Sequence, residues 1–203
     1  MKVLVTGATG FIGHYLVKIL IKRNYHVIAT STNEEKAKRF DWFHQVQYIP
    51  CDLNLPHDNF YKLFGEPDLL IHLSWEGLPN YNELFHIEKN LYSSYAFIKN
   101  MIEHGLKDLS IAGTCSEYGL QEGCLSENLA SRPVTSYGIA KNSLRQFIEA
   151  LRKEHDFHYK WLRLFYMHGK GQSPHSVLSQ LEKALENNEK VFNMSGGEQL
   201  RDY

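Results

Sequence analysis

The stretch MKVLVTGATGFIG, residues 1–13, decides the fold. Its apolar run VLV, residues 3–5, is long enough for one buried strand, and an apolar pattern at helical spacing begins at residue 11. Three glycines lie where the strand turns into the helix: Gly7, Gly10 and Gly13. Such a turn directs backbone N–H groups and the positive end of the helix dipole at one spot, where a pyrophosphate can approach because no Cβ intervenes. The stretch therefore predicts that the chain holds a dinucleotide.

The glycine spacing, G-x-x-G-x-x-G, is one residue looser than the usual G-x-G-x-x-G fingerprint. Glycines can also end a strand for purely structural reasons. The strand-turn-helix context favours the cofactor interpretation over this alternative.

Composition excludes several classes of protein. The 203 residues carry a net charge of −1, which creates no strong field for nucleic acid or a membrane, and no apolar run approaches the roughly 20 residues of a membrane span. Cys51, Cys115 and Cys124 form no C-x-x-C pair, and no leader precedes the first strand, so we expect a cytoplasmic protein. The eleven histidines are scattered without a cysteine or carboxylate cluster at zinc spacing, so we expect no metal.

Apolar runs of strand length alternate with helical patterns along the chain. Strands are expected at residues 3–5, 26–30, 45–50, 67–73, 109–113, 158–165 and near 191–192. Helices are expected at residues 11–23, 80–104, 136–155 and 175–187. This alternation predicts an α/β fold with a Rossmann-type doubly wound parallel sheet and helices on both faces.

Residues at the ends of two predicted strands indicate which cofactor is bound and how it is held. An acid at the end of the second strand would bind the ribose 2′-hydroxyl of NAD, but the tip here begins at Ser31 and has no acid before Glu34. Basic residues follow from Lys36, which favours NADP over NAD unless they merely solvate a helix face. Asp52 follows the third strand, where it either binds the adenine amino group or caps the next turn.

The helix at residues 136–155 carries Tyr137 and Lys141, four positions apart and therefore on one helix face. A free tyrosine has a pKa near 10, and an adjacent cation lowers it. Such a tyrosine can exchange a proton with a carbinol while a hydride moves to or from a nicotinamide. Taken alone, this spacing is typical of a solvated helix face.

Together these motifs resemble the extended short-chain dehydrogenase/reductases, and more closely their NAD(P)-dependent epimerase/dehydratase branch, whose members act on nucleotide sugars. The residues that carry the resemblance follow one another in the expected order: TGATGFIG, Asp52-Leu53, Asn90, Thr114, Tyr118-Gly119 and the run YGIAK at residues 137–141.

The resemblance implies roles for individual residues. The catalytic group would comprise Tyr137 as acid/base, Lys141 to bind the nicotinamide ribose and tune Tyr137, and Thr114 to bind the reacting oxygen of the substrate. The cofactor would be NADP or NAD, held by residues of the strand tips and the first turn: Gly7, Gly10, Phe11, Ile12, Gly13, Ser31, Asp52, Leu53, Leu73, Ser74, Tyr137 and Lys141.

Departures from the family pattern bear on the reaction. The 4,6-dehydratases of the family carry acids where this chain has Cys115 and Ser116, and its only nearby acid, Glu117, is shifted by one residue. Glu117 either serves chemistry or caps a nearby backbone. Tyr166 stands where several epimerases have Asn, and it either contacts substrate or packs. We therefore expect reduction or epimerisation of a nucleotide-linked deoxysugar through a 4-keto group, with a non-catalytic cofactor-binding module or a 4,6-dehydratase as alternatives.

The resemblance also bears on domains and partners. Residues 1–165 would form the NAD(P)-binding domain with the catalytic helix, and residues 166–203 the start of a substrate-binding region. Because the chain ends at Tyr203, we expect the carboxyl-terminal substrate domain to be largely absent. Family members pair the two long helices in a four-helix bundle, so the resemblance implies a homodimer through residues 80–104 and 136–155, unless their apolar residues only cover the sheet.

Overall fold

A computed structural model describes residues 1–121, 123–194 and 196. The chain divides into two compact units, Met1–Arg163 and Leu164–Tyr203, each of which is described by itself. The tail GGEQLRDY, on which the expectation of an incomplete substrate region rests, lies outside the described residues except for Gly196.

The sheet of the first unit has the order β3-β2-β1-β4-β5-β6, and its strands run parallel. Its strands are β1 Lys2–Thr6, β2 His26–Thr30, β3 Gln47–Tyr48, β4 Leu69–His72, β5 Asp108–Thr114 and β6 His158–Leu164. This is the strand order of a Rossmann fold, whose direction of winding reverses between β1 and β4. The predicted fold class is confirmed.

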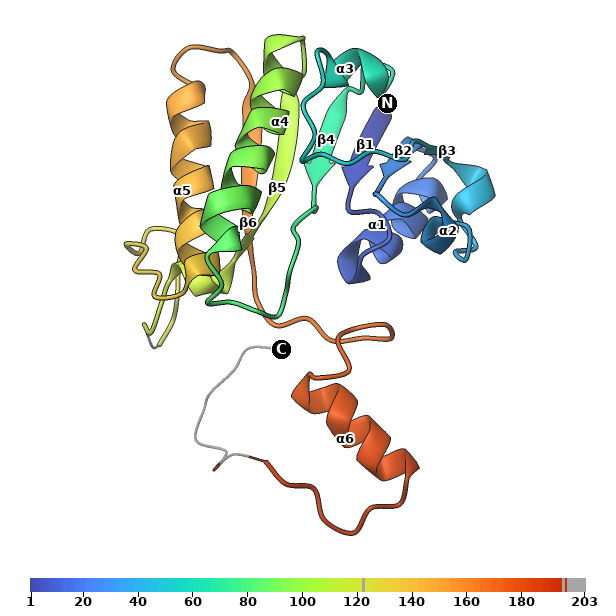
Figure 1. Ribbon diagram of the computed structural model, residues 1–203, viewed down its shortest axis with the longest axis vertical. Coiled ribbons are helices and arrows are strands. Elements are labelled where there is room, and N and C mark those ends of the chain that lie inside the picture. Colours follow the sequence, from blue (N-terminus) through green and yellow to red (C-terminus); the bar gives the residue numbers. More distant parts are fainter. Residues whose placement is uncertain (122, 195, 197–203) are drawn as a thin grey trace. The chain divides into compact units, whose positions relative to one another are not determined.

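Helices cover both faces of this sheet, as Figure 1 shows for α4 and α5 in front of β5 and β6. The helices of the first unit are α1 Phe11–Lys22, α2 Glu34–Ala37, α3 Phe60–Leu63, α4 Tyr92–Glu103 and α5 Ser136–Leu151, with short helices η1 Phe43–Gln45, η2 His86–Leu91 and η3 Cys115–Glu117.

Alternate residues of β1, β2 and β4 supply two separate cores. Leu4 packs in a cluster with residues of α3, α4 and α5, whereas Val3 and Val5 pack in another with residues of α1 and α2. This division follows from the two-residue repeat of a strand, which sends neighbouring side chains to opposite faces. A parallel sheet buried on both faces needs apolar residues at nearly every position.

The prediction of one helix over residues 80–104 is wrong for its first residues. Helical structure begins only at His86, as the π-helix η2, and continues as α4. The preceding carbonyl groups are used in tertiary contacts, since Tyr81 O accepts the N–H of Tyr137 and Asn82 O accepts the hydroxyl of Ser136. These bonds tie the loop to the first residues of α5, so residues 80–85 cannot follow the helical path.

Other boundaries shift less. The helix α5 ends at Leu151 rather than at residue 155. In the second unit, α6 spans Val177–Glu186, with Ser176 accepting the Ser179 N–H at its start. The strand predicted near Val191 does not form, and Val191 is exposed. A strand needs a hydrogen-bonding neighbour, and none of the described strands pairs with these residues.

Candidate functional site

The glycine turn after β1 is crowded on its inner side. Gly7 has φ +66°, and a Cβ there would lie 3.0 Å from the backbone nitrogen of Ser74. A Cβ on Gly13 would lie 2.2 Å from the carbonyl oxygen of Gly7. The backbone of the turn thus closes on itself in a way that only glycine permits.

The amino end of α1 is open toward ligands. Its N-cap residue, Gly10, has no side chain to accept the first N–H groups of the helix. An uncapped helix terminus with its positive dipole end fits a pyrophosphate. Phe11, Ile12 and Gly13 form the first helical turn.

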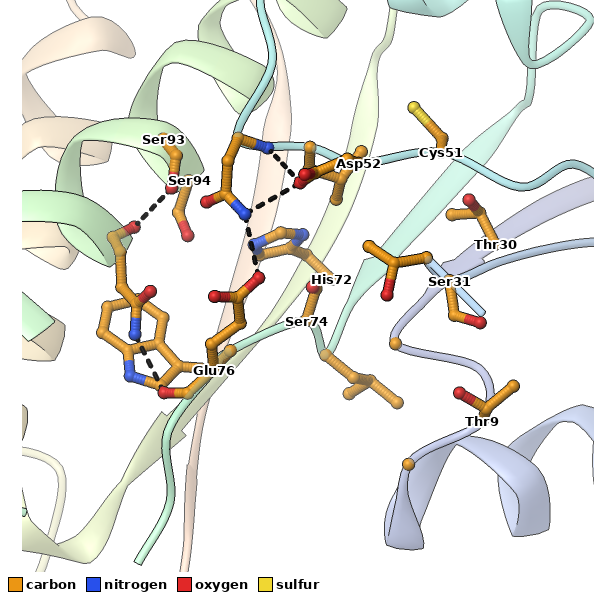
Figure 2. Close-up of a pocket in the computed structure, with 18 of the residues that line it drawn as sticks. Thr9, Thr30, Ser31, Cys51, Asp52, His72, Ser74, Glu76, Ser93 and Ser94 are labelled. Carbon is orange, nitrogen blue, oxygen red and sulfur yellow. Dashed lines mark hydrogen bonds between the residues drawn. The ribbon is translucent and has the colours of Figure 1, made fainter. Parts of the chain in front are cut away.

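A cavity of about 220 Å³ opens at the carboxyl ends of β1, β2 and β4, next to this turn. Figure 2 shows Thr9, Ser31, Asp52, His72 and Ser74 around it. Seven of the predicted cofactor residues line it: Gly7, Gly10, Ser31, Asp52, Leu53, Leu73 and Ser74. The cavity lies where the winding of the sheet reverses, which is the usual ligand position in open α/β sheets.

The side of the cavity formed by β2 and α2 bears hydroxyl groups and one cation. The Ser31 hydroxyl lies 2.8 Å from the Tyr48 hydroxyl, and Lys36 lines the cavity. Asn33 caps α2 by accepting the Lys36 N–H at 2.8 Å. The side chain of Lys38 is occupied elsewhere, in an ion pair with Glu35.

Asp52 holds the next turn. Its Oδ1 accepts the Asn54 backbone N–H at 3.0 Å and the Asn54 side-chain N–H at 2.8 Å. The Asn54 amide also donates to Glu76 (Figure 2). Glu76 in turn pairs with Lys89 at 2.7 Å. The turn-capping interpretation of Asp52 is therefore confirmed, and its contact with adenine stays a prediction.

His72 at the end of β4 was not among the predicted site residues. The Thr6 hydroxyl accepts the N–H groups of Leu73 and Ser74 and donates to His72 Nδ1 at 2.9 Å. This arrangement leaves the proton of neutral His72 on Nε2, which has no hydrogen-bond partner among the described residues. Burial, and secondarily the charge of Lys141, lower the pKa of His72 to about 3.

The predicted catalytic residues come together at the carboxyl end of β5. Thr114 is its last residue, and its side chain lies close enough to that of Tyr137 in α5 to influence the pKa of the phenol. Lys141 lies one turn further along α5, and its Nζ donates to the carbonyl oxygen of Ala112 at 2.8 Å. All three side chains are buried, and neither Tyr137 nor Lys141 lines the cavity.

Burial, rather than Lys141, dominates the pKa of Tyr137. It raises this pKa to about 12, and among the groups that act on it only the Thr114 side chain opposes the shift. Burial also lowers the pKa of Lys141 to about 7. Desolvation of both groups outweighs the attraction that four-residue helical spacing suggests, because each charged form loses water.

Glu117 stabilises the fold around the end of β5. Its Oε1 accepts the Thr114 backbone N–H at 2.8 Å, which completes a capping box at the start of η3. The same carboxylate accepts from Trp161 at 2.9 Å and pairs with Arg163 at 3.1 Å, and it is fully buried. Of the two interpretations of Glu117, the backbone cap is confirmed.

Sequence reasoning missed the aromatic side chains around Tyr137. Trp75 follows β4 and lines the cavity, with its ring centroid 5.9 Å from that of Tyr137. His86 in η2 lies 5.3 Å from Tyr137, between ring centroids. Trp75 stands directly after a strand end, which was a usable signal, whereas His86 gave none that distinguished it from the other histidines.

The part of the chain that the structure describes holds no group of three potential metal ligands. It also has no helix long and apolar enough to cross a membrane. In the second unit, Tyr166 is exposed, and its contact with a substrate stays a prediction.

The Rossmann sheet, the uncapped α1 terminus and the cavity at the β1–β4 reversal define a dinucleotide-binding protein. The model of the NAD dependent epimerase/dehydratase family matches residues 3–203, and the chain belongs to this family of enzymes. It is 31% identical to dTDP-6-deoxy-L-talose 4-dehydrogenase (NAD(+)) of Aggregatibacter actinomycetemcomitans, over all of this chain and 75% of that protein.

Solved structures show the same relationship. A UDP-glucuronic acid 4-epimerase from Bacillus cereus in complex with NAD is 26% identical, with a TM-score of 0.79 over 93% of this chain and 63% of that one. A UDP-glucose 4-epimerase from Thermotoga maritima has a TM-score of 0.84 over 100% of this chain and 69% of that one, and at 24% identity it shows the fold alone. The chain spans between 63% and 75% of the length of these three relatives.

Proposed function

We propose that this protein catalyses NAD(P)-dependent reduction or epimerisation of a nucleotide-linked deoxysugar through a 4-keto group. The observation that carries the proposal is the grouping of the buried Thr114 and Tyr137 side chains at the carboxyl end of β5, with Lys141 one helical turn away. Tyr137 would then be a proton donor next to the site where a dinucleotide would deliver a hydride.

The environment of Tyr137 suits it to act as an acid. When bound, NAD(P) supplies the hydride, which adds to the carbonyl carbon of a keto sugar. The phenol of Tyr137, kept protonated because burial raises its pKa to about 12, gives its proton to the carbonyl oxygen. The Thr114 hydroxyl can donate to that oxygen before the transfer and accept from the carbinol after it.

The reverse proton transfer needs a lower Tyr137 pKa. A positive charge on the oxidised nicotinamide would favour the phenolate. Lys141 would bind the ribose and Gly7, Gly10 and Gly13 would hold the pyrophosphate, as the family resemblance implies. Oxidation followed by reduction on the other face of the ring would give epimerisation.

The relatives support chemistry at the sugar C4 atom. Two of the relatives described above, each more than 25% identical to this chain, are named as a 4-dehydrogenase and a 4-epimerase. A 4,6-dehydratase is disfavoured, because Cys115 and Ser116 occupy the positions of its acids and Glu117 is bonded to Arg163 and Trp161. A non-catalytic module is disfavoured because Thr114, Tyr137 and Lys141 are all present.

Replacing Tyr137 by Phe tests this function. We expect Tyr137→Phe to lower kcat for NAD(P)H-dependent reduction of a 4-keto nucleotide sugar about 10³-fold, with nearly unchanged cofactor binding. Tyr25→Phe, in the turn between α1 and β2 and away from the cavity, is the matched control. Full activity in Tyr137→Phe would exclude the mechanism, and formation of a 4-keto-6-deoxy product from a nucleotide hexose would identify a dehydratase instead.

We further propose that NADP is preferred over NAD. The hydroxyl groups of Ser31 and Thr32 and the ammonium of Lys36 line the cavity, with no carboxylate from this strand tip among them. Lys36→Ala should weaken NADP binding about tenfold and leave NAD binding unchanged. Equal loss of affinity for both cofactors, measured by calorimetry, would contradict a 2′-phosphate contact.

Two further proposals concern the domain organisation and the oligomeric state of the protein. Residues 166–203 would begin the substrate-binding region, and the protein would act in the cytoplasm as a homodimer through α4 and α5. These helices expose Tyr92, Ile139 and Phe147, a surface suited to a partner helix pair. Sedimentation of a monomer at high concentration would remove the dimer.

A further inference from the structure

The ammonium of Lys141 is buried against an aromatic ring. Its Nζ lies 3.9 Å from the centroid of Trp75, and only 2% of the residue is exposed. One of its three protons goes to the carbonyl oxygen of Ala112 at 2.8 Å. No carboxylate forms an ion pair with it among the described residues, so the face of the indole ring supplies much of its negative surroundings.

The Trp75 ring is held by its own hydrogen bond. Its indole N–H donates to His86 Nδ1 at 3.0 Å, and His86 Nε2 donates to the carbonyl oxygen of Asn80 at 2.9 Å. These two bonds together require the neutral histidine with its proton on Nε2. Burial lowers the pKa of His86, which keeps this form in place.

The loop that carries Trp75 is fixed as well. Asn90, buried in η2, donates its side-chain N–H to the carbonyl oxygen of Glu76 at 2.9 Å. The residue after Trp75 is therefore tied to the same helix as His86. The Trp75 ring then packs edge-on against Tyr137, with 5.9 Å between ring centroids.

We propose that Trp75 is a positioning residue for the reaction, whose indole face holds the Lys141 ammonium in place beside the Tyr137 helix turn, with His86 and Asn90 fixing the ring. The inference rests on the proposed function for its catalytic meaning, but the contact between Trp75 and Lys141 is testable without turnover. A ring over Lys141 limits where the ammonium can move, so the cation stays oriented for a cofactor hydroxyl.

Several groups besides Trp75 act on the charge of Lys141. Glu117, next to η3, attracts it, while His72 from β4 and His86 from η2 interact with it less favourably when protonated. Tyr137 lies on the same helix. A test must therefore alter the electron density of the Trp75 ring without changing its volume or the hydration of the site.

Fluorinated tryptophan meets this requirement. Fluorine withdraws electron density from the ring face and weakens the cation–π contact at nearly constant shape. In protein with labelled lysine side chains, Lys141 is followed by NMR and assigned from the signal that Lys141→Arg removes. We expect the pKa of Lys141 to fall by about 0.3 units with 5-fluorotryptophan and about twice that with 5,7-difluorotryptophan.

Trp75→Phe is the matched control, because fluorotryptophan then enters only at Trp42 and Trp161. Lys141 should not respond to fluorination in this variant. An unchanged Lys141 pKa in fluorinated wild-type protein, or an equal response in Trp75→Phe, would overturn the inference. The proposed function fails separately, through full activity of Tyr137→Phe.

Discussion

The two ends of the site are built in different ways. At the glycine turn, the backbone of Gly7–Gly13 and the uncapped α1 terminus border an open cavity. At the tyrosine end, Thr114, Tyr137 and Lys141 are buried and held by hydrogen bonds and ring contacts with side chains of other elements.

The difference shows that backbone conformation alone can build the glycine turn, whereas side-chain packing sets the properties of the tyrosine end. A turn that presents N–H groups needs only the correct φ angles and the absence of Cβ atoms. A buried tyrosine and ammonium have their proton affinities set by desolvation and by every neighbouring dipole. The glycine end should therefore respond to steric changes, and the tyrosine end to changes of charge.

The largest effect is expected at the tyrosine end, from Arg163→Met. The change leaves the fully buried Glu117 without its cation, and an unpaired buried charge costs about 4 kcal/mol of the free energy of unfolding. Lys160→Met, on the same strand, breaks only the exposed pair with Asp108 and should cost less than about 1 kcal/mol. Urea denaturation measures both, and equal costs would show that the Glu117 pair carries no special weight.

The next effect sharpens the steric side of the comparison. Gly13→Ala would bring a Cβ to 2.2 Å from the Gly7 carbonyl oxygen, and we expect a loss of about 3 kcal/mol together with weaker dinucleotide binding. Gly65→Ala meets no atom within 4 Å and bears only the strain of φ +69°, about 1 kcal/mol. Thermal unfolding of the two variants side by side would contradict the steric account if Gly65→Ala were the less stable.

The smallest effect near neutral pH is that of His72, between the two ends. Because its folded pKa of about 3 lies below the unfolded value near 6.5, only the unfolded chain takes up this proton between those values. Stability should fall as the pH drops through this window, by about 1.4 kcal/mol per pH unit from this group.

His72→Asn should flatten this part of the stability curve, while His26→Asn on the exposed end of β2 should leave it unchanged. Chemical denaturation at several pH values between 4 and 7 measures the slopes. A His72→Asn curve parallel to that of the wild type would mean that His72 is protonated in the folded protein.

Local pattern predicted most of the fold. The strand at residues 26–30 has the predicted bounds, and α1 ends one residue before its predicted end. Both are set by apolar periodicity, and the start of α1 is also set by the glycine turn that follows β1. The start of the helix predicted at residue 80 was wrong because the Tyr81 carbonyl accepts the N–H of Tyr137, 56 positions further along the chain.

Within the site, the same limit applies. Sequence spacing placed Tyr137 and Lys141 on one helix face and Thr114 at the end of β5, and the structure has them there. It could not place Trp75 over Lys141 or Arg163 against Glu117, because those contacts join segments far apart in the chain.

By itself, the sequence determined the glycine turn, the alternation of strands and helices, and the residues that resemble the family's catalytic group, because each depends on neighbours within a few positions. Only the tertiary structure decided that Arg163 and Trp161 hold the buried Glu117 carboxylate, that burial raises the pKa of Tyr137, and that an indole ring covers Lys141. The physical reason is that desolvation and packing depend on how distant segments fill one space, which local spacing does not specify.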